Sequence, residues 1–372
     1  MASIQKTPGG KWKGIIRKKG WPTVSKNFRT RRDAEDWSRR VEDEIVRGVY
    51  IDRAPSERMT FSAAMERYLE DETPKKKEST QRAERNRARE LITRFGRYSL
   101  AALNRNVVAK YRNERIANGL KPDTVRNDLA LLSHLFTIAI REWGLGLIEN
   151  PVKAIKKPSP GPGRERRLSH YEDSRLSAQV AAYSNPMLRW IYEIAIESAM
   201  RKSEITGLEV GHVDVRRRFA RPINTKNGET RTVPLSRRAA AIFAEAIANP
   251  MRPKNCSLIF PGEPGRDGVR KPYNFNKAWR EARDTCEIVD LRFQDLRHEG
   301  VSRLVEGGLS DQEVSAISGH KTMQMLKRYS HLRTVNLIEK LDRIRDGDGE
   351  KRDAPRIAAP NSGLESDQSS AD

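Results

Sequence analysis

A segment rich in proline and glycine at residues 149–167 most constrains how this chain can fold. Its breakers are Pro151, Pro158, Pro160, Gly161, Pro162 and Gly163, set among lysines and arginines. Such a composition favours extended, fairly stiff backbone, so we predict a basic linker between two parts of the chain. A length of 372 residues allows two or three domains, each with a core of its own.

The N-terminal residues 1–50 are predicted to form a small β-rich domain. Strand-like runs at 11–17 and 23–28 flank a turn, and Thr30 is a suitable N-cap for a helix that ends at Gly48. Basic residues alternate here with aromatic ones, which suits a sheet face laid against a nucleic-acid groove. Basic residues at a sheet edge also discourage aggregation, so both interpretations stay open. The candidates for DNA contact are Lys11, Lys13, Arg17, Lys18, Lys19 and Lys26, interleaved with Trp12, Trp21 and Phe28.

Residues 59–148 are predicted to form a helical domain. Its helices are expected from Thr60, over about 78–95, over about 105–118, and from Lys121 onward. The last has apolar residues at helical spacing, which indicates the core of a bundle: Val125, Leu129, Leu132, Leu135, Phe136 and Ala139. Arg126 and the other basic residues of these helices are either solvated or reach DNA phosphates.

Residues 168–345 are predicted to form the largest domain, mostly helical with a small antiparallel sheet. Helices are expected at Leu176–Ala182, Leu188–Ala199, and near 236–248, 272–287, 295–306, 310–317 and 333–343. Short strands at 219–223 and 230–235 are joined by a hairpin containing Asn227-Gly228. The tail, residues 346–372, has little apolar content and is expected to be disordered. The fold class is therefore a mainly α, multidomain protein.

The net charge of +21 points to a partner that carries regular negative charge. A third of the residues are charged, at 33%, and both signs occur along most of the chain. The less specific interpretation of this charge is a soluble basic protein, such as a ribosomal one. The more specific interpretation is a protein that binds nucleic acid. Cys256 and Cys286 lie in no metal or disulfide pattern. No signal peptide or membrane-spanning run is evident, so we expect a cytoplasmic protein with no membrane partner.

The C-terminal domain gathers cations, an imidazole and a phenol in short windows. These are Met200-Arg201-Lys202-Ser203-Glu204, Gln294-Asp295-Leu296-Arg297-His298, and Ile317-Ser318-Gly319-His320 with Tyr329 nine residues later. A tyrosine becomes a useful nucleophile toward phosphorus only where cations neutralise the phosphate and a group handles protons. Taken singly, Arg201 is a surface cation, Lys226 a solvated turn residue and Tyr329 a half-buried core residue; together they indicate phosphoryl chemistry.

With the hairpin Thr225-Lys226-Asn227-Gly228, these windows resemble the motifs of tyrosine recombinases of the phage-integrase family. The resemblance covers most of 60–345. Residues 1–50 resemble the arm-type DNA-binding domain of many integrases, and 59–148 correspond to a core-binding domain. The run from Ala316 to Arg333 is similar to shufflon-type DNA invertases.

The resemblance implies a site-specific recombinase that needs neither a metal nor a cofactor. Tyr329 would attack the scissile phosphate and form a 3′-phosphotyrosyl bond, while Arg201 and Arg297 hold the non-bridging oxygens. Lys226 would protonate the leaving 5′-oxygen, and His320 would donate a hydrogen bond to the phosphate. Glu204 would orient the site. His298 either packs or hydrogen-bonds locally, or contacts the scissile phosphate.

One position departs from the family pattern. A histidine usually stands three residues before the second arginine, and here that residue is Gln294. An amide can hydrogen-bond the phosphate or the tyrosine oxygen but cannot accept a proton near neutral pH. The alternatives are an active enzyme in which Gln294 only positions, and a catalytically impaired DNA-binding or architectural protein of the same fold.

The resemblance also implies partners. These are double-stranded DNA with core sites and arm sites, a homotetramer that exchanges strands through a Holliday junction, and accessory proteins that bend DNA. Such a protein would be associated with the nucleoid.

Overall fold

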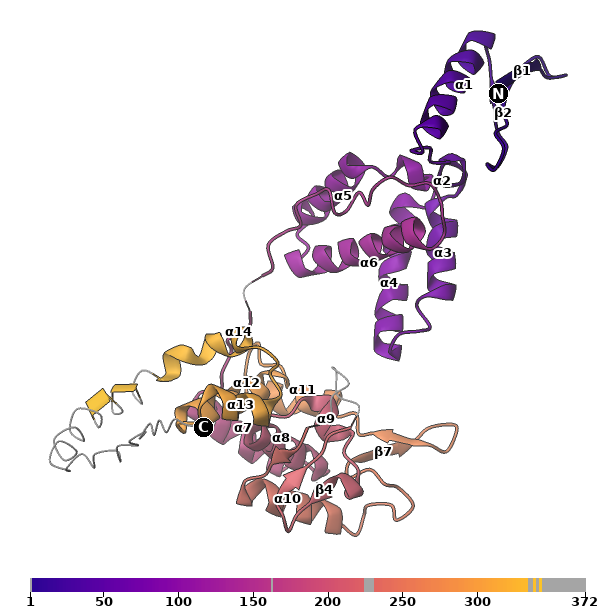
Figure 1. Cartoon of the computed structure of the whole chain (residues 1–372). Helices are drawn as coiled ribbons and strands as arrows, with labels where there is room; N and C mark the ends of the chain where they lie inside the picture. Colours follow the sequence, from indigo (N-terminus) through magenta and orange to yellow (C-terminus); the bar gives the residue numbers. More distant parts are fainter. Residues whose placement is uncertain (1, 162, 224–230, 334–336, 339–340, 343–372) are drawn as a thin grey trace, which may run out of the picture. The chain divides into compact units, whose positions relative to one another are not determined.

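The structure, a computed structural model, describes residues 2–161, 163–223, 231–333, 337–338 and 341–342 (Figure 1). The chain divides into two compact units, Met1–Pro162 and Gly163–Asp372, and the division falls inside the predicted linker. Both units are mainly helical with small antiparallel sheets, which confirms the predicted fold class. In these ranges no helix combines the length and hydropathy needed to cross a membrane.

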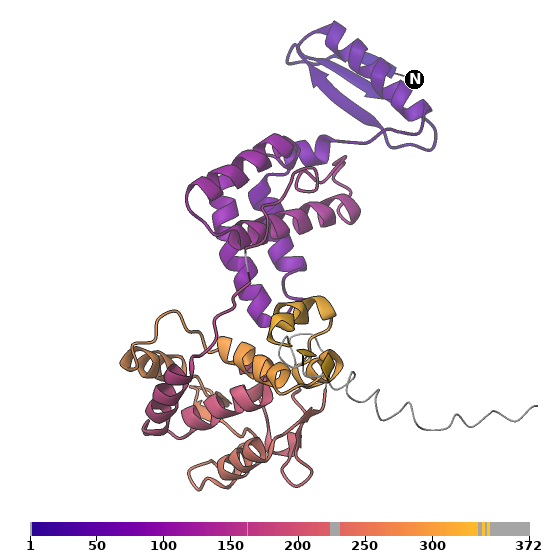
Figure 2. The ribbon, with the colours of Figure 1, turned by 90° about the vertical axis from the view of Figure 1, so that its left-hand side faces the viewer.

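The chain begins with an antiparallel sheet in the order β1-β2-β3, and helix α1 covers one face of it (Figure 2). The bounds are β1 (Ala2–Lys6), β2 (Trp12–Ile16), β3 (Val24–Phe28) and α1 (Arg31–Val46). The Thr30 hydroxyl accepts from the Asp33 amide, which confirms the predicted N-cap. Strand β1 was not predicted, because Ala2–Lys6 has little of the β-branched and aromatic content that marks strands.

The register of this sheet decides which side chains α1 covers. Trp12 lies directly opposite Phe28, and Ile16 opposite Val24, so these residues share one face. On that face Ile16 packs with α1, and the Phe28 and Trp37 rings lie 5.4 Å apart. The sequence suggested that Trp12 and Phe28 interleave with basic residues on a face that meets DNA. Both rings lie instead on the side of the sheet that α1 covers, and not on the opposite, open face. The open face presents Ser3, Gln5, Lys13, Ser25 and Asn27 around the buried Ile15.

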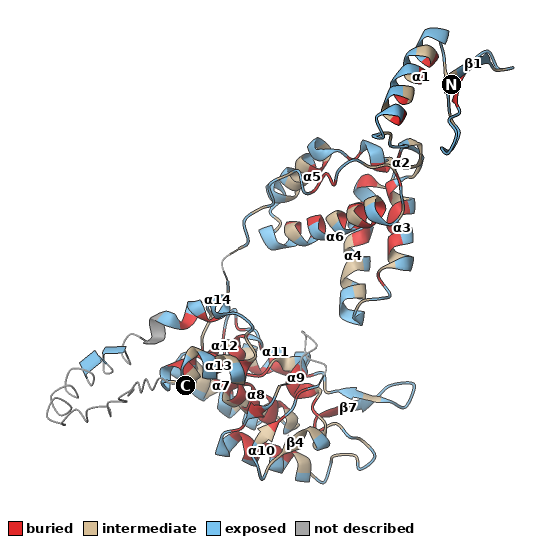
Figure 3. Ribbon diagram, viewed as in Figure 1, coloured by how far each residue is buried: buried red, intermediate tan, exposed pale blue. Residues whose placement is uncertain are grey.

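The rest of the first unit is a helical bundle. Its helices are α2 (Ala54–Arg58), α3 (Phe61–Asp71), α4 (Glu78–Phe95), η1 (Leu100–Ala102), α5 (Arg105–Ala117) and α6 (Pro122–Arg141). The predicted starts and ends of α4 to α6 are confirmed to within a few residues. The stripe from Val125 to Ala139 is buried against α3 to α5, as predicted for a bundle core (Figure 3).

The second unit surrounds the buried helix α8 (Met187–Ser198). Its other helices are α7 (His170–Ala181), α9 (Lys202–Thr206), η2 (Val210–His212), α10 (Arg237–Ala248), α11 (Asn276–Thr285), α12 (Asp295–Glu306), α13 (Asp311–Ser318), α14 (Met323–Leu326) and η3 (Lys327–Arg333). The predicted helix at 333–343 falls largely outside the described residues, as do the tail and the hairpin turn at 224–230.

Two small sheets flank these helices. One has the order β4 (Val213–Asp214), β5 (Phe219–Ala220) and β6 (Val233–Pro234). Strands β5 and β6 pair antiparallel, as the hairpin signal predicted, although both are shorter than expected. The other sheet, β7 (Pro261–Pro264) with β8 (Arg270–Pro272), was not predicted, because its prolines argue against strands.

Candidate active site

Arg297 is buried where helix α12 meets the end of α8. Helix α8 ends at Ser198 and is followed by Ala199, whose left-handed backbone (φ 51°) turns its carbonyl toward the arginine. Arg297 Nη1 donates to the Ala199 carbonyl at 2.6 Å, and Nη2 donates to the Ser318 carbonyl at 2.7 Å. Burial and the nearby Arg201 lower the pKa of Arg297 to about 10, so it remains a cation at neutral pH. The guanidinium is thus fixed by two carbonyls and keeps further N–H groups for a ligand.

Glu204 holds two arginines together beneath the start of α9. Its carboxylate accepts from Arg201 Nη1 at 2.7 Å, from the Arg201 amide at 3.0 Å, and from Arg231 Nη2 at 2.7 Å. The residue is 2% exposed. Burial alone would raise the pKa of Glu204, but the hydrogen bonds from Arg231 and Arg201 outweigh it and lower the pKa to about 2. An ionised, immobilised carboxylate therefore orients Arg201.

The turn after α13 presents His320 to these arginines. Gly319 ends α13 with φ 70°, and Arg231 Nε donates to the neighbouring Ile317 carbonyl at 3.3 Å. His320 Nε2 lies 3.5 Å from Arg297 Nη2, and Nδ1 lies 2.7 Å from the Ser318 hydroxyl. The Ser318 hydroxyl donates to the Val314 carbonyl, so it accepts from Nδ1–H. Burial and the cations Arg297 and Arg201 lower the pKa of His320 to about 3, so the ring is neutral.

Replacing Gly319 with alanine is expected to destabilise this turn. The left-handed backbone costs an L-residue about 1–2 kcal/mol, and an added Cβ would lie 2.9 Å from Arg231 Cζ. Gly119→Ala is a matched control, because Gly119 has φ 78° and its Cβ would meet nothing within 4 Å. Urea denaturation should show a larger loss for Gly319→Ala than for Gly119→Ala. Equal losses would contradict the contact with Arg231.

Tyr329 lies in η3 with its ring against α12. It is 5% exposed and packs with Ala199, Val301 and Leu326. Its hydroxyl lies 2.6 Å from His298 Nδ1. Burial raises the pKa of Tyr329, against the opposing effect of Arg328 and Arg297, so the phenol is protonated at neutral pH.

A cavity of about 110 Å³ opens beside this pair. It is lined by Arg164, Glu165, Arg167, His298, Ser302, Arg328 and Tyr329. Two of its arginines are tied to α12: Arg164 Nη2 donates to Asp295 at 2.7 Å, and Arg167 Nε donates to Glu299 at 3.0 Å. These basic residues of the predicted linker therefore belong to the second unit.

The structure brings most of the predicted site residues into one region. Arg201, Glu204, Arg297 and His320 are linked by the contacts above, and Tyr329 is joined to α12 through His298. Gln294 is exposed at the N-terminus of α12, with no side-chain hydrogen bond to the described residues. Lys226 lies outside the described residues.

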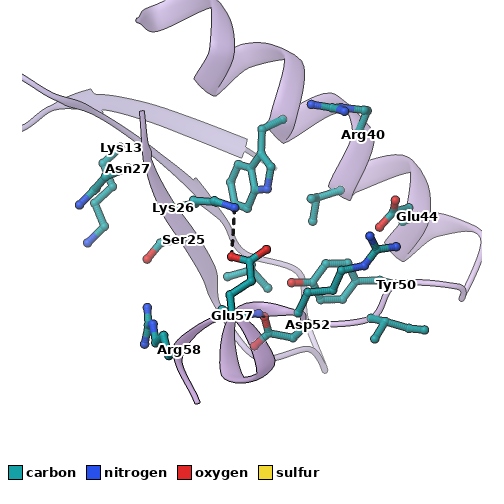
Figure 4. Close-up of a pocket in the computed structure, with 16 residues that line it drawn as sticks. Lys13, Ser25, Lys26, Asn27, Arg40, Glu44, Tyr50, Asp52, Glu57 and Arg58 are labelled. Carbon is teal, nitrogen blue, oxygen red and sulfur yellow. Dashed lines mark hydrogen bonds and ion pairs between the residues drawn. The ribbon is translucent and has the colours of Figure 1, made fainter. Parts of the chain in front are cut away.

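The DNA-contact candidates of the first unit differ in what they touch. Lys11, Arg17, Lys18 and Lys19 are exposed, and Lys13 is on the open face of the sheet. Lys26 instead lies opposite Gly14 on the α1 side, where its Nζ is 3.6 Å from a Glu57 carboxylate oxygen (Figure 4). Both residues line a cavity of about 540 Å³. Arg126 Nη1 donates to the Pro158 carbonyl at 2.7 Å.

Arg231 is the functional residue that sequence reasoning missed. It follows the hairpin in a polar run, so nothing local distinguishes it from a solvated cation. The sequence offers no signal for it, because the burial of Glu204 is known only from the structure. Arg231 forms a second ion pair with Glu204 and also contacts the turn that carries His320.

Known integrases and recombinases resemble this chain over much of its length. The Phage integrase family profile matches residues 166–335. The chain is 38% identical to the Shufflon-specific DNA recombinase of Escherichia coli over 81% of this chain and 75% of that protein. It is 29% identical to a putative integrase/recombinase of Haemophilus influenzae over 88% and 86% of the two chains.

Solved structures share the fold at low sequence identity. The Tn1549 transposon integrase in complex with circular intermediate DNA superposes with a TM-score of 0.60, at 16% identity, over 73% of this chain and 95% of that one. The lambda integrase dimer bound to a COC′ core site gives 0.59, at 18% identity, over 89% and 95%. The chain therefore belongs to the phage integrase family and is a tyrosine site-specific recombinase.

Proposed function

We propose that this recombinase cuts and rejoins DNA strands through a covalent bond between Tyr329 and a 3′-phosphate. The observation that carries the proposal is the gathering of Arg201, Arg297 and His320 by contacts between α8, α9, α12 and the turn after α13, with Tyr329 held on α12. Phosphodiester transfer builds negative charge on the non-bridging oxygens, and fixed cations stabilise that charge without reorganising. Integration, excision and inversion of DNA all follow from this one chemistry.

The proton steps are divided among different residues in this proposal. Lys226 protonates the leaving 5′-oxygen. Neutral His320 presents its Nε2 lone pair to Arg297 in the free protein. It therefore donates to a phosphate oxygen only after taking up a proton, which the dianionic transition state favours.

The first unit is proposed to hold the DNA. Residues 1–50 would act as an arm-type domain through the polar open face of the sheet, where Lys13 stands among hydroxyl and amide side chains. Residues 59–148 would bind the core site, with accessory proteins bending the DNA between sites. Binding to chromosomal DNA would place the protein at the nucleoid.

Four copies are proposed to act together through a Holliday junction. Lambda integrase has been solved as a tetramer bound to a Holliday junction, with a TM-score of 0.57 to this chain. The helical residues Leu337, Ile338 and Leu341 expose 52%, 54% and 64% of their surface, which suits docking on a neighbouring copy.

A nicked duplex made from DNA flanking the gene tests the proposal. Loss of the short strand beyond the nick prevents rejoining, so wild-type protein should accumulate a covalent adduct that survives denaturing electrophoresis. Tyr329→Phe should bind the same duplex and form no adduct. Binding and bending by wild type with no adduct would instead support the catalytically impaired, architectural alternative, which the glutamine at position 294 motivates.

A further inference from the structure

We propose that His298 accepts the proton of Tyr329 when the tyrosine attacks phosphorus, so that the chain does not depend on a base at position 294. This inference rests on the proposed function, since it assigns a role within the same strand-cleavage step. It makes His298 a catalytic residue, because His298 touches the reacting oxygen itself.

The geometry is that of a nucleophile paired with its base. His298 Nδ1 lies 2.6 Å from Tyr329 Oη, within the range for direct proton transfer. The two side chains come from α12 and η3, which pack on one another through Val301 and Tyr329, with Leu326 of α14 in the same cluster. His298 directly follows Arg297, so the helix that fixes the phosphate-binding cation also carries the base.

The surroundings keep the imidazole able to accept a proton. Burial lowers the pKa of His298, as do the cations Arg328, Arg297 and Arg164, while Asp295 opposes them. The cavity beside the pair adds Glu165 and Arg167 as charged neighbours. The neutral ring with its hydrogen on Nε2 leaves the Nδ1 lone pair directed at the phenol.

Gln294 cannot act as the base. Its side chain is exposed and makes no hydrogen bond to the described residues, and an amide takes no proton at neutral pH. A base is nevertheless required, because the pKa of the buried Tyr329 is raised and little phenolate forms spontaneously.

The Tyr329 oxygen forms the bond to phosphorus as its proton passes to His298 Nδ1. The bond from phosphorus to the 5′-oxygen breaks, and that oxygen takes a proton from Lys226. Rejoining reverses both transfers, so His298 returns the proton to Tyr329 and neither side chain is consumed.

The test compares two substitutions of His298 in the nicked-duplex assay. His298→Asn keeps a hydrogen-bonding group near the Nδ1 position but cannot take a proton, and His298→Ala removes both. Both variants should form adduct about 10²-fold more slowly at neutral pH, the lower end of the usual contribution of base catalysis. Wild type should lose activity only as the pH falls below the ordinary histidine range, and that acid limb should be absent from both variants. His170→Asn, an exposed histidine in α7, should behave as wild type.

A substrate with sulfur in place of the 5′-bridging oxygen shows which proton transfer each residue assists, that of the nucleophile or that of the leaving group. A thiolate leaves without protonation, so sulfur should restore Lys226→Ala and leave both His298 variants slow. Restoration of the His298 variants by sulfur would overturn the assignment, since His298 would then serve the leaving group. If His298→Asn reacts at the wild-type rate, His298 only positions Tyr329, and this result would also overturn the assignment of His298 as the base. Absence of adduct in wild type on either substrate is a different result, because it contradicts the proposed function itself.

Discussion

Replacing Arg297 with lysine is expected to slow adduct formation by about 10²–10³-fold, the usual effect of removing one fixed donor to a developing oxyanion. The guanidinium donates to the Ala199 and Ser318 carbonyls and keeps further N–H groups for the phosphate. An ammonium carries the same charge but lacks the planar fork, so one nitrogen would have to reach both carbonyls and the phosphate. The measurement is the rate of adduct formation on the nicked duplex at saturating protein.

The same substitution at an exposed position serves as a control for the effect of position. Arg292 is an exposed arginine shortly before α12, and Arg292→Lys should leave the rate unchanged. DNA affinity of Arg297→Lys, measured by gel shift, should fall far less than its rate. Parallel losses in affinity and rate would show that Arg297 contributes to binding rather than to the transition state.

Replacing Glu204 with glutamine is expected to destabilise the second unit by about 3–5 kcal/mol, because it leaves Arg201 and Arg231 near one another without a counter-charge. The folded pKa of about 2 lies below the unfolded value of 4.5. A depressed pKa gives stability that is complete above the unfolded value and is lost as the pH falls toward the folded one. The wild-type protein should thus lose about 3 kcal/mol between pH 4.5 and pH 2 from this residue.

Urea denaturation at several pH values checks this result. The difference in unfolding free energy between wild type and Glu204→Gln should shrink steadily below pH 4.5. Glu263→Gln is a control, because the Glu263 carboxylate is 96% exposed and its contact with Arg270 is 3.8 Å long. A difference that stays constant with pH would mean that Glu204 acts through packing rather than through its charge.

Helices with strong local signals were predictable from the sequence. The apolar stripe and the start of α6 follow from spacing and from Pro122 in the first turn, and Thr30 and Thr60 both cap helices as expected. Strands that depend on partners were not: β1 is defined by its pairing with β2, and β7 with β8 by a proline-containing hairpin. The periodicity of apolar residues depends only on residues close in the sequence, whereas a strand is stabilised by residues that are distant in the sequence.

The candidate site divides in the same way. Arg201, Arg297, His320 and Tyr329 could be selected because their chemistry and order form a recognisable set. Their partners could not, because contacts such as Arg231 with Glu204, or His298 with Tyr329, join segments that only tertiary structure brings together. The role of the Ala199 carbonyl could not be predicted either, since it depends on a backbone angle rather than on a side chain.

The ion pairs of Arg164 and Arg167 with α12 determine where a free-standing catalytic fragment has to begin. The side chains of Asp295 and Glu299 are only 2% and 5% exposed, and those arginines neutralise them from the segment just before residue 168. A fragment beginning at Leu168 would leave Asp295 without its guanidinium partner on the helix that carries Arg297 and His298. The shortest fragment that preserves this helix therefore starts at or before Arg164, within the segment that the sequence alone predicts to be a linker.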